Sequence, residues 1–150
     1  MKRILITGAN KGIGLATVAK LLGSYDETFL LMGSRDSKKG QQALNSLLDI
    51  QPEWKDRLDL IQIDVEQDLS VNSAAEEVVT KFGKTPSPLY AIVNNAGIGD
   101  SMLGLNKVLQ VNTFGPKRVC DAFLPLLNPS IGRVVNVTSA SGPLYLAGSS

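Results

Sequence analysis

A glycine-rich segment near the N-terminus carries the clearest chemistry in the sequence. Residues 7–14 read Thr-Gly-Ala-Asn-Lys-Gly-Ile-Gly, directly after a short apolar run and at the start of a segment with helical periodicity. Gly8 allows a tight turn, Gly12 lets the backbone approach a pyrophosphate, and Gly14 lets the helix pack close to the strand. This spacing predicts a phosphate-binding turn at the positive end of a helix. An ordinary glycine-rich strand-to-helix turn is the alternative.

The elements that would position this turn follow from the hydrophobic pattern. Short apolar runs that do not alternate in polarity are typical of strands covered on both faces, and here they alternate with segments of helical period. Such a pattern predicts an α/β fold with a parallel sheet and helices on both faces. We expect strands at Ile4–Thr7, Thr28–Met32, Leu58–Ile63, Leu89–Val93 and Arg133–Val137, and helices at Gly12–Leu22, Lys38–Ile50, Leu69–Phe82 and Leu103–Leu127.

Local signals set some of the element boundaries. The second helix should end before Pro52, and the third should open after Asp68, acting as N-cap, and stop near Gly83. The chain shows no internal repeat, low-complexity tract or linker. We therefore expect residues 1–150 to form one domain, with an irregular tail over residues 141–150.

Three further motifs follow later strands. Asp64-Val65 closes the third apolar run, Asn94-Asn95-Ala96-Gly97 follows the fourth, and the segment 134–139, Val-Val-Asn-Val-Thr-Ser, contains the fifth. Each could separately be turn chemistry, but ligands bind at this carboxyl edge of parallel sheets. Together with Thr-Gly-x-x-x-Gly-Ile-Gly, these motifs resemble the short-chain dehydrogenase/reductase family over almost the whole chain. The Asn-Lys-Gly-Ile-Gly sequence and the Arg35 region most resemble its carbonyl-reductase branch.

The resemblance implies a Rossmann-type doubly wound parallel sheet, truncated after the strand that carries the catalytic serine. It also implies an NADP(H)-dependent oxidoreductase that acts on a small carbonyl or alcohol substrate. In the family, the aspartate of the third strand accepts from the adenine amino group. The residues that match cofactor-binding positions are Gly8, Asn10, Lys11, Gly12, Ile13, Gly14, Ser34, Arg35, Asp64, Val65, Asn94, Asn95, Ala96 and Gly97.

The residues at the end of the second strand indicate whether the chain would bind NADP(H) or NAD(H). By the family's register, Ser34 occupies the position where an NAD site offers a carboxylate, and Arg35 follows it. A hydroxyl and a guanidinium would bind a 2′-phosphate that a carboxylate would repel, and Lys11 adds a second cation. Alternatively, Arg35 and Lys11 are solvated surface charges, or Asp36 is an NAD-type acid in a shifted register. We expect NADP(H).

The catalytic residues are matched only in part. In the family, a serine and a tyrosine bind the substrate carbonyl, and an asparagine anchors a relay water. Ser139 and Asn112 match the serine and the asparagine. Pro116 has no N–H, so the carbonyl of residue 112 loses its helical partner and could hold that water. A plain proline kink in a buried helix is the alternative.

The family's catalytic tyrosine and its lysine are missing. The lysine stands four residues after the tyrosine and lowers its pKa, which is needed because free tyrosine titrates near pH 10. Tyr145 is the only tyrosine after Ser139, and Ser149 stands four residues beyond it. We expect Tyr145 to be a loop residue. Loss of a positioned acid typically costs a factor of about 100 to 10,000 in rate, so the chain by itself should be a poor catalyst.

Composition excludes several other classes of function. The chain has 15 Lys+Arg against 14 Asp+Glu, so it has no field that would attract nucleic acid or an anionic membrane. Without histidine and with one cysteine, a zinc or haem site lacks its usual ligands, and we expect no metal. Cys120 fits a small core residue in a reducing compartment. No stretch could serve as a signal peptide or span a bilayer, so we expect a cytoplasmic protein.

Three functions remain open. The sequence fits an NADP(H)-dependent oxidoreductase that is truncated or incomplete, a non-catalytic NADP-binding module, or an interaction protein with an inherited fold. The third would use the hydrophobic edge of the fifth strand, where uncovered Val134, Val135 and Val137 invite self-association. We favour the oxidoreductase on its motifs. The substrate and the direction of reaction are not encoded in any motif of the chain.

Overall fold

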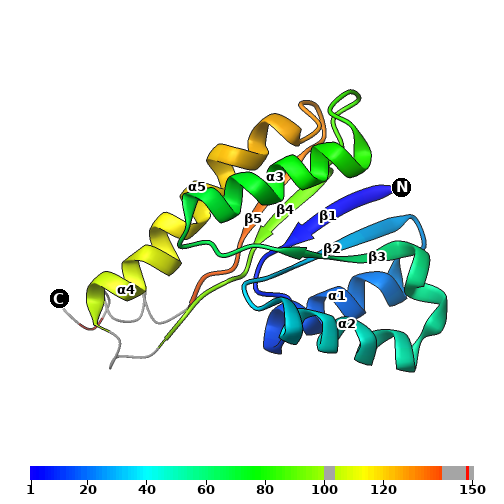
Figure 1. The fold of residues 1–150 in the computed structure, drawn as a ribbon, viewed down its shortest axis with the longest axis horizontal. Helices are drawn as coiled ribbons and strands as arrows, with labels where there is room; N and C mark the ends of the chain where they lie inside the picture. Colours follow the sequence, from blue (N-terminus) through cyan, green and yellow to red (C-terminus); the bar gives the residue numbers. More distant parts are fainter. Residues whose placement is uncertain (100–103, 140–147, 149–150) are drawn as a thin grey trace.

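Five parallel strands form one sheet through the middle of the molecule (Figure 1). The computed structural model describes residues 1–99, 104–139 and 148. The strand order is β3-β2-β1-β4-β5. The chain thus moves outward from β1 to β3, then returns to the other side of β1 with β4. The strands are β1 (Lys2–Ile6), β2 (Thr28–Ser34), β3 (Leu58–Gln62), β4 (Ala91–Asn94) and β5 (Arg133–Asn136).

Helices cover both faces of this sheet. Figure 1 shows α1 (Gly12–Ser24) and α2 (Ser37–Ile50) on one face, and α3 (Asp68–Phe82) and α5 (Gly115–Phe123) on the other. Successive strand residues point to opposite faces. Leu5 and Leu31 therefore join the core beneath α3 and α5, while Ile4, Ile6 and Met32 join the core beneath α1 and α2.

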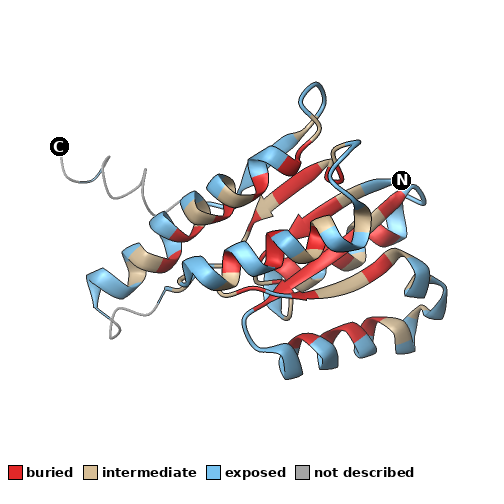
Figure 2. Cartoon of the chain, turned by 45° about the horizontal axis from the view of Figure 1, so that its top comes forward, coloured by how far each residue is buried: buried red, intermediate tan, exposed pale blue. Residues whose placement is uncertain are grey.

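Burial explains why the strands are apolar without alternation. Leu5, Ile6, Leu31 and Met32 have no exposed surface, and the buried residues in Figure 2 follow the strands and the inward helix faces. The doubly wound parallel sheet predicted from the sequence is confirmed, and α1, α2 and α3 begin and end within two residues of the predicted bounds. The six-residue 3₁₀ segment η1 (Pro52–Arg57), between α2 and β3, was not predicted.

Two details of the helices differ from the predictions. The N-cap of α3 is Gln67, and Asp68 lies inside the first turn, where its Oδ1 accepts from Arg118 Nε at 2.8 Å. The helix predicted over Leu103–Leu127 is present as an unbroken helical run from Leu105 to Leu126, but its hydrogen-bonding pattern changes along its length. The described part of this segment divides into α4 (Leu105–Leu109), the π-helical turn η3 (Gln110–Phe114), α5 and the 3₁₀ turn η4 (Leu124–Leu126).

Prolines account for these changes in the hydrogen-bonding pattern of the helix. Pro116 cannot donate to the carbonyl four residues earlier and its ring crowds that carbonyl, so the backbone widens to a π-turn just before it. Pro125, which also has no N–H to donate to the preceding turn, stands near the start of η4, where α-helix changes to 3₁₀-helix. Single π-turns of this kind are frequent at functional sites.

The C-terminal part leaves apolar surface exposed. The exposed fractions of Val134, Val135 and Val137 are 38%, 47% and 45%, as expected for the edge of the sheet. The predicted irregular tail, including Tyr145, lies outside the described residues except for Gly148. Among the described helices, none combines the length and apolar character needed to cross a membrane.

Candidate functional site

A cleft of about 380 Å³ opens at the carboxyl ends of the strands, where the order of the sheet reverses between β1 and β4. Loops from opposite sides of the sheet diverge at this point, which is where ligands bind in open α/β sheets. The turn after β1 and the loops after β2, β3 and β4 all contribute to its wall. The lining residues are Gly8, Asn10, Lys11, Gly12, Ile13, Arg35, Ile63, Asp64, Val65, Glu66, Asn95, Ala96, Gly97, Ile98 and Val111.

Two of the three glycines of the first turn, Gly8 and Gly14, occupy positions where a side chain would not fit. Gly8 has φ +65°, and an added Cβ would lie 2.9 Å from the Cα of Ala96. At Gly14 an added Cβ would lie 2.5 Å from Asn95 Nδ2. Gly12 has φ +56°, and no atom of the described chain lies within 4 Å of its added Cβ. The outer glycines therefore allow close packing, while the backbone at Gly12 faces open space.

The N-terminus of α1 is suited to an anion. Its N-cap, Lys11, has extended backbone and makes no capping hydrogen bond through its side chain among the described residues, and the first turn contains no acid. The first-turn N–H groups and the positive end of the helix dipole therefore lack a carboxylate or hydroxyl partner from the cap. A helix end in this state readily binds a phosphate.

Thr7 and Asn95 hold the turn after β1 against the loop after β4. Thr7 is 1% exposed, and its Oγ1 accepts from the backbone N–H groups of Asn95 at 3.1 Å and Ala96 at 3.0 Å. Asn95 Nδ2 donates to the carbonyls of Thr7 at 2.9 Å and Gly8 at 3.2 Å. Sequence reasoning missed the role of Thr7. Its position between a buried strand and the glycine turn was the available signal.

The loop after β2 separates the alternatives for Arg35 and Asp36. Arg35 lines the cleft, with a side chain 66% exposed. Asp36 is instead the N-cap of α2: its Oδ1 accepts from Lys39 N at 3.0 Å, and this backbone N–H lowers the pKa of the carboxyl. Ser34 is buried, and its Oγ donates to the Asp36 carbonyl at 2.8 Å. Of these two residues, Arg35 therefore lines the cleft, and Asp36 caps α2.

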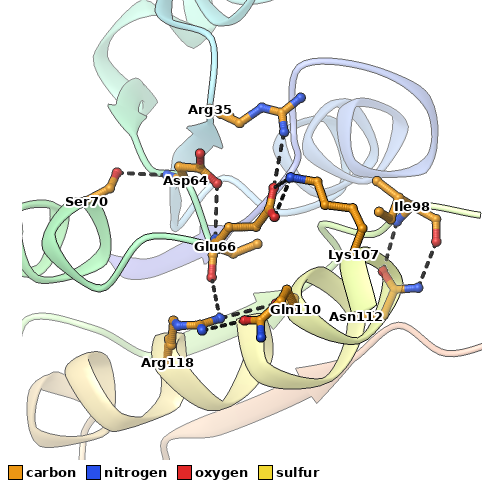
Figure 3. A network of polar contacts seen from close by, with 10 residues as sticks. Arg35, Asp64, Glu66, Ser70, Ile98, Lys107, Gln110, Asn112 and Arg118 are labelled. Carbon is orange, nitrogen blue, oxygen red and sulfur yellow. Dashed lines mark hydrogen bonds and ion pairs between the residues drawn. The ribbon is translucent and has the colours of Figure 1, made fainter. Parts of the chain in front are cut away.

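The loop after β3 contributes two carboxylates to the cleft. Asp64 is held in place because its N–H donates to Ser70 Oγ at 2.9 Å and its Oδ1 accepts from Glu66 N at 3.1 Å. Glu66 is nearly buried, with a side chain 10% exposed, and pairs with Lys107 of α4 and with Arg35 (Figure 3). No sequence motif pointed to Glu66 or Lys107.

The π-turn η3 and α5, which follows it, fasten the loops after β4 and β3. Asn112 Oδ1 accepts from Ile98 N at 2.9 Å, and its Nδ2 donates to Ile98 O at 2.7 Å (Figure 3). Arg118 donates to the carbonyls of Val65 at 3.4 Å and Gln110 at 3.2 Å. The Asn112 side chain thus positions the wall of the cleft, and its predicted relay water stays a prediction. Arg118 was missed because its partners are distant in sequence.

Three other predicted site residues lie apart from the lining. Asn94 is 4% exposed, and its Nδ2 donates to Asn136 Oδ1 at 2.9 Å, between β4 and β5. Ser139 is an exposed residue beyond the end of β5. Ser34 and Asn94 as cofactor ligands, and Ser139 as the catalytic serine, stay predictions. A fourth predicted residue, Gly14, also lies outside the lining, in the first turn of α1.

The cleft brings together most of the predicted cofactor-binding residues. These are Gly8, Asn10, Lys11, Gly12, Ile13, Arg35, Asp64, Val65, Asn95, Ala96 and Gly97. The described part of the chain contains no group of three His, Cys, Asp or Glu side chains that could hold a metal ion. The cleft therefore combines a helix N-terminus, two cations and two carboxylates.

The sequence and the fold both match known proteins. The family model described as short chain dehydrogenase matches residues 2–150. The chain is 36% identical to the short-chain dehydrogenase anuI of Penicillium roqueforti, over 96% of the chain and 58% of that protein. It is 32% identical to (+)-neomenthol dehydrogenase of Arabidopsis thaliana, over 93% of the chain and 54% of that protein. The chain thus spans little more than half of these relatives.

A solved structure extends the match to three dimensions. The NADPH-bound carbonyl reductase from chicken fatty liver superposes with a TM-score of 0.79 at 29% identity. This match covers 99% of the present chain and 64% of that protein. The shared architecture includes the sheet edge at which the cleft opens.

Proposed function

The chain belongs to the short-chain dehydrogenase family, and on that basis we propose that its cleft binds NADP(H). We further propose that the protein is an oxidoreductase that transfers a hydride between this cofactor and a small carbonyl or alcohol substrate. The observation that carries the proposal is the N-terminus of α1, where the open backbone at Gly12 borders the cleft. That cradle fits a pyrophosphate, because N–H groups and the helix dipole favour an anion there.

The charges of the cleft favour NADP(H) over NAD(H). Arg35 and Lys11 both line it, and each can neutralise a 2′-phosphate. Asp36, which would repel that phosphate, instead caps α2. The NADPH bound by the chicken carbonyl reductase supports the same preference. Asp64, by family resemblance, would accept from the adenine amino group.

The bound cofactor supplies the hydride, and this chain supplies part of the substrate site. Ser139 is proposed to bind the substrate carbonyl through its hydroxyl. Asn112 holds Ile98 in the wall beside the cofactor. The proton donor is a separate requirement, since the 150 residues contain no Tyr-x-x-x-Lys sequence. Turnover is therefore proposed for a protein in which such an acid completes the site.

A fluorescence titration with NADPH and NADH tests the cofactor assignment. Arg35→Ala should weaken the binding of NADPH about fivefold, because a charged hydrogen bond at an exposed side chain contributes about 1 kcal/mol to the binding free energy. NADH binding should change by less than a factor of about two. Arg133→Ala, an exposed arginine at the start of β5, is the matched control and should alter neither affinity. Equal losses for both cofactors at Arg35, or no binding of either by the unaltered chain, would contradict the proposal.

A cofactor-binding module without turnover is the second candidate. It uses the same cleft, and it is favoured because most of the proposed cofactor-binding positions line that cleft whereas Ser139 lies apart from it. The two functions separate in one experiment, in which NADPH oxidation is followed with a panel of small ketones and aldehydes. Saturable NADPH binding with no oxidation by any of them would favour the module.

A further inference from the structure

One carboxylate links the two sides of the cleft at its charged end. Glu66, in the loop after β3, has Oε1 2.6 Å from Lys107 Nζ of α4 and Oε2 3.5 Å from Arg35 Nη1 of the loop after β2 (Figure 3). The Glu66 side chain is 10% exposed, against 45% for Lys107 and 66% for Arg35. The anion is thus the fixed member of the group, and the cations approach it from solvent.

We propose that Glu66 sets the strength of the preference for a 2′-phosphorylated cofactor, because its carboxylate is held beside Arg35 and repels the 2′-phosphate that Arg35 would bind. Lys107 limits this repulsion by neutralising Glu66. The inference rests on the proposed NADP(H) site. It assigns to Glu66 and Lys107 a part in specificity that no motif of the chain indicates.

The geometry indicates which contact a phosphate would displace. The Arg35 contact is long and its side chain is mostly exposed, so the guanidinium can turn toward an incoming phosphate at little cost. The Lys107 contact is short, and Lys107 Nζ also lies 2.8 Å from Glu66 Oε2. The backbone of Glu66 is held by its N–H bond to Asp64 Oδ1. The carboxylate therefore stays near Arg35 when the phosphate binds.

Repulsion between the carboxylate and the phosphate gives the expected effect. The interaction between two unit charges about 4 Å apart in water changes a binding constant by a factor of roughly five. A phosphate monoester carries about −1.5 to −2 at neutral pH, and Lys107 cancels part of the Glu66 charge. Glu66→Gln, which keeps the side-chain shape, should strengthen binding of NADPH and of adenosine 2′,5′-bisphosphate about three- to tenfold. NADH and AMP should change by less than a factor of about two.

Lys107 provides a second, independent variant. In Lys107→Gln, Glu66 keeps Arg35 as its cationic partner, so NADPH should bind several-fold more weakly, with NADH unchanged. In the double variant with Glu66→Gln, the Lys107 substitution should have no further effect. If Lys107→Gln still weakened NADPH binding in the Glu66→Gln background, Lys107 would contact the phosphate itself, and its assigned role would be overturned.

Isothermal titration with the two nucleotide pairs separates the outcomes. Glu66→Asp keeps the charge and should bind like the unaltered chain, and thermal melting verifies that every variant is folded. If the unaltered chain binds NADPH and prefers it, but Glu66→Gln changes the binding of NADPH and NADH equally, the repulsion by Glu66 is refuted and the cofactor site stands. If the unaltered chain binds neither cofactor nor adenosine 2′,5′-bisphosphate, the proposed function fails, and this inference falls with it.

Discussion

Replacing Thr7 by valine tests how the turn after β1 is held. Valine has nearly the same shape as threonine but no hydroxyl, so the N–H groups of Asn95 and Ala96 lose their acceptor without a change in packing. An unsatisfied buried donor costs about 1–3 kcal/mol. Both amides belong to partly buried residues, so we expect the free energy of unfolding to fall by about 2–4 kcal/mol in total.

Urea denaturation followed by circular dichroism measures this difference. Such a loss is a large part of the total stability of a typical domain, about 5–15 kcal/mol, and should shift the midpoint clearly. Affinity for NADPH should also fall, since Asn95 and Ala96 line the cleft opposite Gly8. Both effects follow from the same two hydrogen bonds, so they should appear together.

Two control variants test whether the loss of stability comes from the Thr7 hydroxyl. Thr7→Ser keeps the oxygen and loses a methyl group, so it should cost only about 1 kcal/mol. Thr80→Val removes an exposed hydroxyl on α3 that donates to Glu76 O, and should change stability by less than about 0.5 kcal/mol. If Thr7→Val were as stable as Thr80→Val, the two amides would not depend on the hydroxyl, and the reasoning would be refuted.

Two further predictions concern α1 and α2. Gly14→Ala should destabilise the chain by about 1–3 kcal/mol, because the new Cβ would lie 2.5 Å from both Asn95 Nδ2 and the Gly8 carbonyl oxygen. Gly23→Ala, where the nearest atom would be 3.7 Å away on Trp54, should be neutral or slightly stabilising in the same denaturation assay. The Lys39 N–H lowers the pKa of Asp36, so the stabilisation from this carboxylate is present above the ordinary aspartate pKa of about 3.9 and is lost as the pH falls through the lowered value. Asparagine can also cap a helix, so the melting temperature of Asp36→Asn should equal that of the unaltered chain at pH 7 and fall less steeply as the pH is lowered. If the melting temperatures of the two proteins fell in parallel with pH, the pKa shift would be contradicted.

Several features of this protein were predictable because their causes are local. Buried parallel strands require continuous apolar runs, and the runs of β1, β2 and β3 are visible in the sequence. The glycines at 8, 12 and 14 were predicted for steric reasons that the structure bears out at Gly8 and Gly14. The helical periodicity on both sides of Pro116 predicted a continuous run of helix, and Pro116 itself is the local cause of the π-turn η3 within it.

The contacts that shape the cleft were not predictable, since they join residues far apart in the chain. Glu66 meets Arg35 and Lys107 only because β2 and β3 are neighbours in the sheet and α4 returns over the same edge. The positions of Arg35 and Asp36 also depended on the fold. Asp36 caps α2 through its hydrogen bond from Lys39 N, whereas Arg35 lines the cleft.

The sequence by itself therefore determined the layered parallel fold, the glycine turn after β1 and the family, because apolar periodicity and glycine sterics act over a few residues. Only the tertiary structure decided how the four loops meet at the switch point. Thr7, Glu66, Asn112 and Arg118 hold those loops together through hydrogen bonds and ion pairs across the sheet edge. Such contacts have no signature in a linear chain, since each depends on a partner that folding brings near.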